Sequence, residues 1–322
     1  ERKLAQEIGI SYNTARRVAN ILVEKGLLER KENGRLDTAQ SSQQNLQVAY
    51  ISPAFSSMLY YQWLGNLVSA ADTFGIQVRP FQYIHNNDVI FPQILNSVDA
   101  AFLVLTCETV SDYLLELIQS SKTIVVALER DLTQHGIPSI MTRTAQAVDL
   151  LLDHLKKLGH RRLIALNTQP ANEVIQERLA RLNQVSREMD LNLEILNDPV
   201  KPFGNARTRA IEVMNQFLDA EPLHATAIIG VTEDNAIAIR RVLYERNISI
   251  PEDVSLCSIS NEGLCPHIAP SITSTHEVDA QVYINRSLKS IVEGKWEGNL
   301  LLQPTYLRLF AGESTAAPRV NQ

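Results

Sequence analysis

The sequence predicts an α/β protein with a small helical head at its N-terminus. From Gln47 onward, short apolar runs alternate with amphipathic stretches that are long enough to form helices. This alternation is typical of parallel sheets with helices on both faces. The first 35 residues differ, because they hold two helical stretches followed by a short basic hairpin, at the spacing of a winged helix-turn-helix.

Length and composition limit the classes of protein to consider. The chain has 322 residues, which is enough for two or three domains. Hydrophobic residues make up 45% and charged residues 20%, as in globular proteins, and no apolar run approaches the roughly 18 residues of a membrane span. We therefore expect no membrane partner. Cys107, Cys257 and Cys265 are few and widely spaced, which predicts a reducing, cytoplasmic location rather than a disulfide framework.

Helix signals define the head. Leu4, Ala5 and Ile8 form an apolar stripe, and Gly9 can end that helix in a left-handed conformation. A second helix is expected over 12–25, after Ser11 as N-cap. Its apolar face holds Ala15, Val18, Ala19 and Leu22, and its polar face holds Tyr12, Asn13, Arg16, Arg17 and Asn20.

A basic hairpin follows over residues 27–35. Asn33-Gly34 favours a type I′ turn between two strands. An exposed helix with Asn and Arg can contact base edges in the major groove, and a basic hairpin can contact phosphates or enter the minor groove. The alternative is a solvated amphipathic helix pair, since the head carries a net charge of only +2. The candidate DNA-binding residues are Arg2, Ser11, Tyr12, Asn13, Thr14, Arg16, Arg17, Arg30, Lys31 and Arg35.

The rest of the chain is predicted to be a linker and two lobes. Residues 38–46 are polar and aperiodic, as in a linker. A break near 159–162 divides the following 47–322 into two α/β lobes. The predicted strands are 48–52, 77–83, 100–105, 123–128, 163–167, 193–196, 227–231 and 254–259, and the predicted helices are 60–74, 110–120, 145–158, 172–189, 206–220, 234–246 and 279–293.

Motifs for catalysis or cofactor binding are absent from the sequence. There is no glycine-rich phosphate loop and no G-x-S-x-G nucleophile motif. Cys257, Cys265 and His267, with His276, have no zinc-site spacing, and Cys257 fits a strand interior as a small apolar side chain. We therefore expect no enzyme activity, no catalytic residues, no cofactor and no metal.

The head resembles a GntR-type winged helix-turn-helix. The matching segments are ERKLA (1–5), IGISYNTARRV (8–18) and EKGLL (24–28). That family has one more helix before the first segment, so we expect the chain to begin inside this domain, which would span residues 1–37. The resemblance implies that Arg2, Tyr12, Arg16 and the hairpin contact DNA, although Arg is more usual where Tyr12 stands.

The body resembles the effector-binding region of LacI/GalR-type repressors, which have the two-lobed fold of periplasmic sugar-binding proteins. The matching segments are LKKLGHRRL (155–163), Glu177-Arg178-Leu179, ATAII (225–229), IPEDVSL (250–256) and IAPSITS (268–274). The resemblance implies an effector-binding domain over 47–322, with the ligand between the lobes. Strand C-termini of both lobes face each other there.

The resemblance also implies ligand-binding positions. Arg178 matches an arginine that forks onto a ligand hydroxyl or carboxylate, and the alternative for it is a surface ion pair with Glu173 or Glu177. The positions after the first strand have an ordinary loop as their alternative. The full set is Ser52, Phe55, Tyr60, Arg143, Arg178, Thr232, Ser260, Asn261 and Glu277.

Two of these positions depart from the family pattern and bear on the effector. An aspartate is common in that family where Ser260 and Arg143 stand here, which argues against a plain neutral hexose as the effector. The alternatives that stay open are a purine, a sugar phosphate, a uronic acid, an unusual saccharide or an effector that is not a sugar. The function predicted is a ligand-responsive, DNA-binding transcriptional regulator, a repressor, whose effector is a sugar or sugar derivative. A single head would bind operator DNA weakly, so we expect a homodimer. The alternative is a sugar-binding protein or an α/β enzyme without a role at DNA.

Overall fold

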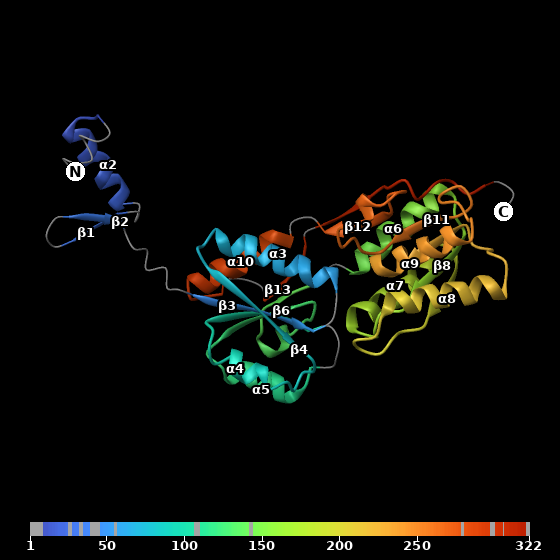
Figure 1. Cartoon of the computed structure of the whole chain (residues 1–322), viewed down its shortest axis with the longest axis horizontal. Helices are drawn as coiled ribbons and strands as arrows, with labels where there is room; N and C mark the ends of the chain where they lie inside the picture. The colour runs from blue at the N-terminus through green and yellow to red at the C-terminus, as the bar shows by residue number, and fades with distance from the viewer. Residues whose placement is uncertain are drawn as a thin grey trace.

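The computed structural model describes residues 9–24, 28–31, 35–38, 46–54, 57–105, 110–141, 144–277, 280–296, 300–304 and 306–319. Within these, the chain forms a helix-and-hairpin head and a body of two α/β lobes (Figure 1). The predicted first helix and the Asn33-Gly34 turn lie outside the described residues. None of the described helices is long and apolar enough to cross a membrane.

The head begins as its capping signals predict. Gly9 has a φ of +73°, and the Ser11 hydroxyl accepts a hydrogen bond from the Thr14 amide at 3.1 Å. Helix α2 (Tyr12–Glu24) follows, and strands β1 (Leu28–Arg30) and β2 (Leu36–Thr38) pair antiparallel. Strand β2 thus reaches one residue into the predicted linker. Val18 is 41% exposed, because the helical rotation places it at the edge of the stripe that Ala15 and Ala19 bury.

The first lobe is built on a parallel sheet with the strand order β13-β7-β6-β5-β3-β4. Helices α3 and α10 cover one face and α4 and α5 the other. The bounds are β3 (Gln47–Pro53), α3 (Met58–Asp72), β4 (Gln77–Tyr83), α4 (Ile90–Ile94), β5 (Ala100–Val104), α5 (Asp112–Ser120), β6 (Ile124–Leu128), the 3₁₀ turn η1 (Thr133–His135), β7 (Ser139–Ile140), α10 (Ala280–Val292) and β13 (Leu301–Leu302).

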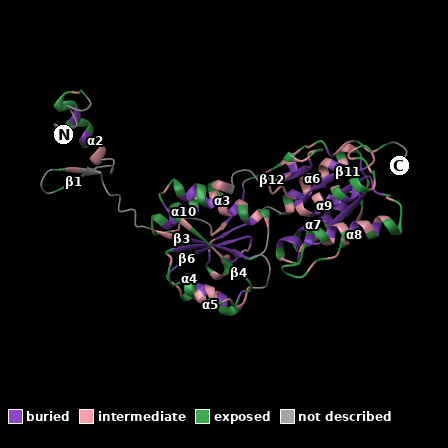
Figure 2. Cartoon of the chain, in the orientation of Figure 1, coloured by how far each residue is buried: buried purple, intermediate pink, exposed green. Residues whose placement is uncertain are grey.

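The second lobe repeats this three-layer arrangement, with the strand order β14-β12-β11-β10-β8-β9. Only the β12–β14 pair of this sheet is antiparallel. Figure 2 shows the central strands of both lobes as buried, which places one apolar core on each side of each sheet. The bounds are α6 (Thr144–Leu158), β8 (Arg162–Asn167), α7 (Glu173–Glu188), β9 (Asn192–Asn197), α8 (Ala206–Ala220), β10 (Ala227–Gly230), α9 (Glu233–Glu245), β11 (Ser255–Ser258), the 3₁₀ turn η2 (Cys265–His267), β12 (Thr273–Glu277) and β14 (Leu307–Phe310).

The predicted lobe boundary near 159–162 is wrong. Helix α6 already packs into the second lobe, where Val148, Leu151 and Leu155 are fully buried with the strands of its sheet. The chain therefore crosses between β7 and α6, and Gly159, with a φ of +102°, only ends α6. The chain crosses back before α10 and again before β14, so three connections join the lobes.

Candidate ligand-binding cleft

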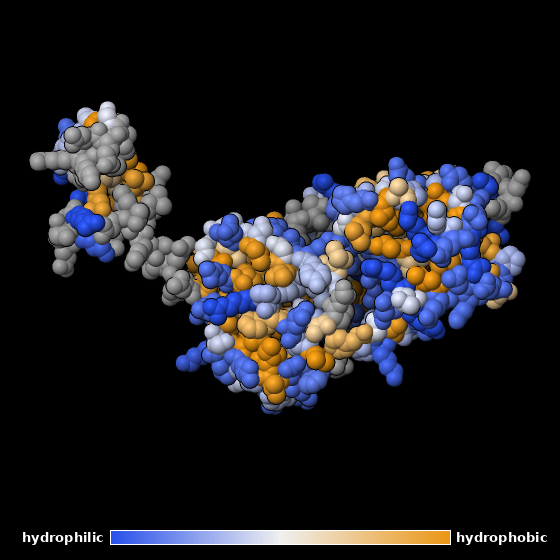
Figure 3. Space-filling view, viewed as in Figure 1, coloured by the Kyte–Doolittle hydropathy of each residue, from blue (hydrophilic) through white to orange (hydrophobic). Residues whose placement is uncertain are grey.

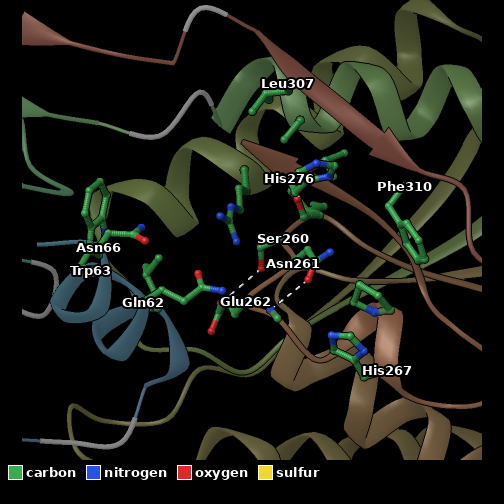
Figure 4. Close-up of a pocket in the computed structure, with 17 residues that line it drawn as sticks. Gln62, Trp63, Asn66, Ser260, Asn261, Glu262, His267, His276, Leu307 and Phe310 are labelled. Carbon is green, nitrogen blue, oxygen red and sulfur yellow. Dashed lines mark hydrogen bonds between the residues drawn. The ribbon is translucent and has the colours of Figure 1, made fainter. Parts of the chain in front are cut away.

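A cavity of about 590 Å³ opens between the two lobes (Figure 4). Helix α3 of the first lobe supplies one wall. The loop after β11 and residues of β12 and β14 supply most of the other. A smaller hollow of about 80 Å³ continues from it, and Leu59, Arg178 and Glu262 line both. The large cavity is lined by Leu59, Gln62, Trp63, Asn66, Ala147, Arg178, Ile259, Ser260, Asn261, Glu262, Gly263, Pro266, His267, Thr275, His276, Leu307 and Phe310.

The first-lobe wall is fixed by the packing of α3. Trp63 is buried in the core of the lobe, and its indole Nε1 donates a hydrogen bond to Glu129 at 3.0 Å. Glu129 follows β6 and has a φ of +61°, a region that residues other than glycine rarely adopt. Gln62 and Asn66 are spaced four apart on α3, so both amides reach the cavity from one helix face (Figure 4).

A buried carboxylate organises the second-lobe wall. Glu233 is 1% exposed, and its Oε2 accepts hydrogen bonds from the backbone amides of Glu262, Leu264 and Cys265 at 2.9–3.0 Å. Its own amide donates to the Ser260 hydroxyl at 3.2 Å. The loop after β11 is therefore held against the start of α9, which sets the positions of the side chains that line the cavity.

A polar network supports the smaller hollow. Thr232 is the N-cap of α9, and Gln169 donates to its hydroxyl at 3.3 Å. The fully buried Asn235 donates to Thr168 Oγ1 at 2.8 Å, and Thr168 donates to the carbonyl of Ala206 at 2.7 Å. These bonds satisfy polar groups that would be costly to bury unpaired, so the hollow is preformed.

Arg178 enters the cleft from the first turns of α7. Its side chain is 9% exposed, and Nη1 donates to the carbonyl of Val231 at 2.9 Å. The alternative prediction for Arg178 was a surface ion pair with Glu173 or Glu177. The structure pairs Glu173 with Arg130 at 2.7 Å, across the lobes, and it buries Arg178 rather than leaving it at the surface. The guanidinium of Arg178 thus lies at the junction of the two hollows.

Glu262 is the most perturbed acid of the cleft. Burial, followed by the negative charges of Asp234 and Glu233, raises its pKa to about 7, against the opposing effects of Arg178 and the Leu59 backbone amide. Because Leu59 belongs to α3, this carboxyl of the second lobe contacts the first lobe. At neutral pH the side chain can therefore both donate and accept hydrogen bonds.

The far end of the cavity is less polar. Leu307 and Phe310 come from β14, and Ile259 directly follows β11. His267 and His276 border this region (Figure 4). The cavity therefore combines a polar end near Glu262 and Arg178 with an apolar end near β14, as small-molecule sites commonly do.

The structure brings five of the nine predicted ligand residues to the cleft. Arg178, Ser260 and Asn261 line the large cavity, and Arg178, Thr232 and Tyr60 line the smaller hollow. Ser52, at the end of β3, is buried and lines neither one. Phe55, Arg143 and the side chain of Glu277 lie outside the described residues.

Sequence reasoning missed Gln62, Trp63, Glu262 and the β14 residues. The signal for Glu262 is present, because it follows Ser260 and Asn261 in the loop after a strand. Nothing in the pattern shows which face of α3 will meet the second lobe, and the short strand β14 reaches the cleft only after the last crossing between the lobes.

The head presents most of the predicted DNA-binding residues at its surface. Asn13, Thr14, Arg16 and Arg17 are exposed on α2, as are Ser11 and Tyr12 at its start. Lys31 and Arg35 are exposed beside the hairpin strands, and the exposed Arg30 donates to Asn20 Oδ1 at 3.0 Å, which joins the hairpin to α2. Arg2 lies outside the described residues.

The body of the protein is similar to known proteins. A family model described as a periplasmic binding protein-like domain matches residues 152–282. A LacI family transcriptional regulator of Bifidobacterium animalis subsp. lactis superposes with a TM-score of 0.69 at 19% identity, over 85% of this chain and 98% of that one. The body has the periplasmic-binding-protein-like fold.

Other relatives share this fold. A LacI family regulator of Arthrobacter sp. FB24, in complex with lactose, has a TM-score of 0.70 at 15% identity, over 84% of this chain and 99% of that one. The curated HTH-type transcriptional repressor PurR of Photobacterium profundum is 21% identical over 180 residues, or 54% of this chain. The alignment covers 52% of PurR, so the chain spans about half the length of that relative.

Proposed function

We propose that the protein is a ligand-responsive, DNA-binding transcriptional regulator, a repressor, whose effector binds between the two lobes. The observation that carries this proposal is the presence, in one chain, of a preformed interlobe cavity and a helix-and-hairpin head with exposed Asn and Arg side chains. The relatives with the same body fold are named as transcription regulators, which supports regulation rather than an enzymatic reaction.

We assign the head to the winged helix-turn-helix class, of GntR type. The order of α2 and then an antiparallel strand pair supports this assignment, as does the Arg30 to Asn20 bond between helix and hairpin. In this arrangement α2 enters the major groove and the hairpin contacts the phosphates of operator DNA.

The effector belongs to the chemistry of sugars and sugar derivatives. Solved regulators with this fold are described with bound ribose and in complex with lactose. Amide and hydroxyl side chains beside aromatic ones, such as Gln62, Asn66, Ser260 and Trp63 here, are suited to a polyol with an apolar face. The direct contacts we propose are made by Arg178, Thr232, Ser260 and Asn261.

A homodimer connects the two sites. Ligand binding changes how the lobes meet, and in a dimer this shift alters the spacing of two heads that must reach half-sites about one DNA turn apart. The coupling is a free energy shared by the two binding equilibria, so effector and operator change each other's affinity by the same factor.

The test is DNA binding by the full-length protein to a duplex selected from random sequences. Arg16→Ala is expected to weaken binding by about 1–3 kcal/mol and to relax specificity at one position, as for an arginine bidentate to guanine. Lys31→Ala is expected to weaken binding to all sequences alike. The slope of log affinity against log salt concentration should become shallower by about one, because one phosphate contact is lost.

Arg79→Ala, an exposed arginine on β4 of the body, is the matched control and should bind like the wild type. Fluorescence anisotropy at several salt concentrations measures all three. If the wild type selects no sequence, or if the double variant at Arg16 and Lys31 binds as tightly as the wild type, the proposed function is wrong.

A further inference from the structure

Glu262 occupies the junction of the two parts of the cleft. Of the described acidic residues, it is the one that lines both the large cavity and the smaller hollow. Its carboxyl shares this junction with the Arg178 guanidinium, and Gln62 lies opposite on α3 (Figure 4). Any ligand that spans both hollows must pass this carboxyl.

The charged groups around Glu262 are mostly acidic. Glu233 and Asp234 face it from α9 and Arg178 from α7, while α3 offers the neutral Gln62 and the Leu59 amide. Arg207 on α8 pairs with Asp234, and Arg178 donates to a carbonyl. The other described carboxyls nearby already have strong partners: Glu233 accepts three backbone amides, and Glu129 accepts the Trp63 indole. The Glu262 carboxyl lines both hollows and accepts a long bond of 3.4 Å from the Ser260 hydroxyl, so it is the one that we expect a ligand to meet.

The site therefore favours a cation over an anion. Asp234 and Glu233 make ionisation of Glu262 unfavourable, and Arg178 offsets them only in part, so in a partly dry cleft a further positive charge stabilises the Glu262 carboxylate. Trp63, Leu307 and Phe310 leave the remainder of the cavity apolar and aromatic.

We propose that the effector carries a protonated amine, which pairs with the Glu262 carboxylate, and an apolar or aromatic body that packs near Trp63, Leu307 and Phe310. This inference deepens the proposed function, on which it rests, by naming the class of effector. An amino sugar has this chemistry and agrees with the sugar-like effector proposed above. An aryl-ethylamine has the same charge on a body that is not a sugar, so its binding would replace the sugar part of that proposal. A sugar phosphate or a uronic acid lacks the positive charge.

Binding of the amine is coupled to a proton. The amine arrives already protonated, no covalent bond forms or breaks, and a neutral Glu262 releases its proton to solvent as the ion pair forms.

The ionised carboxylate then accepts a stronger hydrogen bond from the Leu59 amide at the start of α3. The first turn of α3 contains no acidic residue, and its N-cap Ser57 makes no side-chain cap bond, so Glu262 supplies the negative charge that this helix end favours. Effector binding thus strengthens a contact between the lobes.

Two matched sets of probes test the charge preference by titration calorimetry at pH 7 on the whole chain. One set is tyramine, tyrosol and 4-hydroxyphenylacetate, and the other is glucosamine, glucose and glucuronate. We expect the amine of at least one set to bind at least ten-fold more tightly than its hydroxyl counterpart, with the acid weakest. Glu262→Gln should remove this preference, whereas Glu252→Gln, an exposed glutamate of the same lobe, should keep it.

Proton release is the second readout. Because the pKa of Glu262 is about 7, roughly half a proton should be released per amine bound at pH 7, seen as a difference in binding enthalpy between phosphate and Tris buffers. Release should be absent in Glu262→Gln, whose folding is checked by its melting curve.

Several outcomes would overturn the inference: amines that bind no better than their neutral partners or not at all, a preference that survives Glu262→Gln, or amine binding without proton release. If neutral or acidic probes bind instead and change affinity for DNA, the amine inference fails while the proposed function stands.

Discussion

Single side chains fix the shape of the cleft through hydrogen bonds that the sequence pattern does not predict. Thr232 was predicted to bind the ligand from its place after a strand, whereas the next residue, Glu233, was given no role. In the structure Glu233 points away from the ligand cavity and holds three amides of the loop that carries Ser260 and Glu262. The sequence predicts that residues following the strands lie near the cleft. It does not predict which of them face the ligand and which support the loop, because that depends on the direction of each side chain.

His160 should make the stability of the second lobe sensitive to acid. It is 1% exposed, its Nδ1 lies 2.9 Å from Thr226 Oγ1, and its Nε2 donates to the carbonyl of Ala316. Burial lowers its pKa from the ordinary 6.5, against the effect of the Ala316 carbonyl. The native state therefore binds this proton less readily than the unfolded state, so the stabilising contribution is complete above pH 6.5 and falls as the pH drops below it.

The measurement is urea denaturation of the wild type and His160→Gln between pH 8 and pH 5. The stability advantage of the wild type over the variant should shrink as the pH falls through this range, because glutamine does not titrate. Comparing the two proteins removes contributions shared by other groups, such as His154. An advantage that stays constant with pH would contradict the assignment.

At the scale of elements, the strands that alternate regularly with helices were predictable, whereas the strands next to the crossings between the lobes were not. The predicted ranges of β4 and α8 agree with the structure to the residue. The strands β7, β12, β13 and β14 were missed, as was the short helix α4. Strand β12 reads Thr-Ser-Thr-His-Glu, and its first three residues are buried despite their polar side chains. Strands β7 and β13 have two residues each, so only their pairing with other strands defines them.

The contact between β10 and α9 depends on Gly230. A Cβ at this position would lie 2.4 Å from the Ala236 amide nitrogen, which is backbone and cannot rotate away. Gly230→Ala should therefore push α9 from the sheet and destabilise the protein by about 1–3 kcal/mol or more. Because α9 carries Thr232 and Glu233 at its start, the loop of the cleft should loosen as well.

Gly65→Ala is the control, since a Cβ there would meet nothing within 4 Å and alanine favours a helix. Thermal melting of the two variants should separate them clearly. Equal melting temperatures would mean that the close approach of β10 and α9 relaxes at little cost.

For the whole molecule, the cleft depends on connections rather than on any one segment. Its lining runs from Leu59 to Phe310, and the chain crosses between the lobes three times to bring these parts together. Sequence periodicity placed the helices and strands but put the lobe boundary at the end of α6 instead of its start. The reason is physical: an amphipathic helix does not indicate which of two flanking sheets its apolar face will cover.

The outer layer of the first lobe is where we expect the dimer to form. Helices α3 and α10 pack side by side on one face of the sheet, and apolar surface is visible over them in Figure 3. Val68 on α3 is 48% exposed and Val282 on α10 is 54% exposed. Exposed apolar side chains on paired helices are typical of interfaces between copies of a chain.

Val68→Glu combined with Val282→Glu should therefore convert a dimer into a monomer, because burying two carboxylates beside their symmetry copies in an apolar interface is costly. The mass in solution, measured by light scattering at micromolar concentration, should halve. Affinity for a two-half-site operator should fall at least ten-fold, since one head loses the gain from its linked partner. Tyr244→Glu, on α9 of the second lobe and 73% exposed, should change neither. A variant that stays dimeric would show that the dimer forms elsewhere. A monomeric wild type would rule out a change in head spacing as the means of regulation, and the effector would then have to control DNA binding within each single chain.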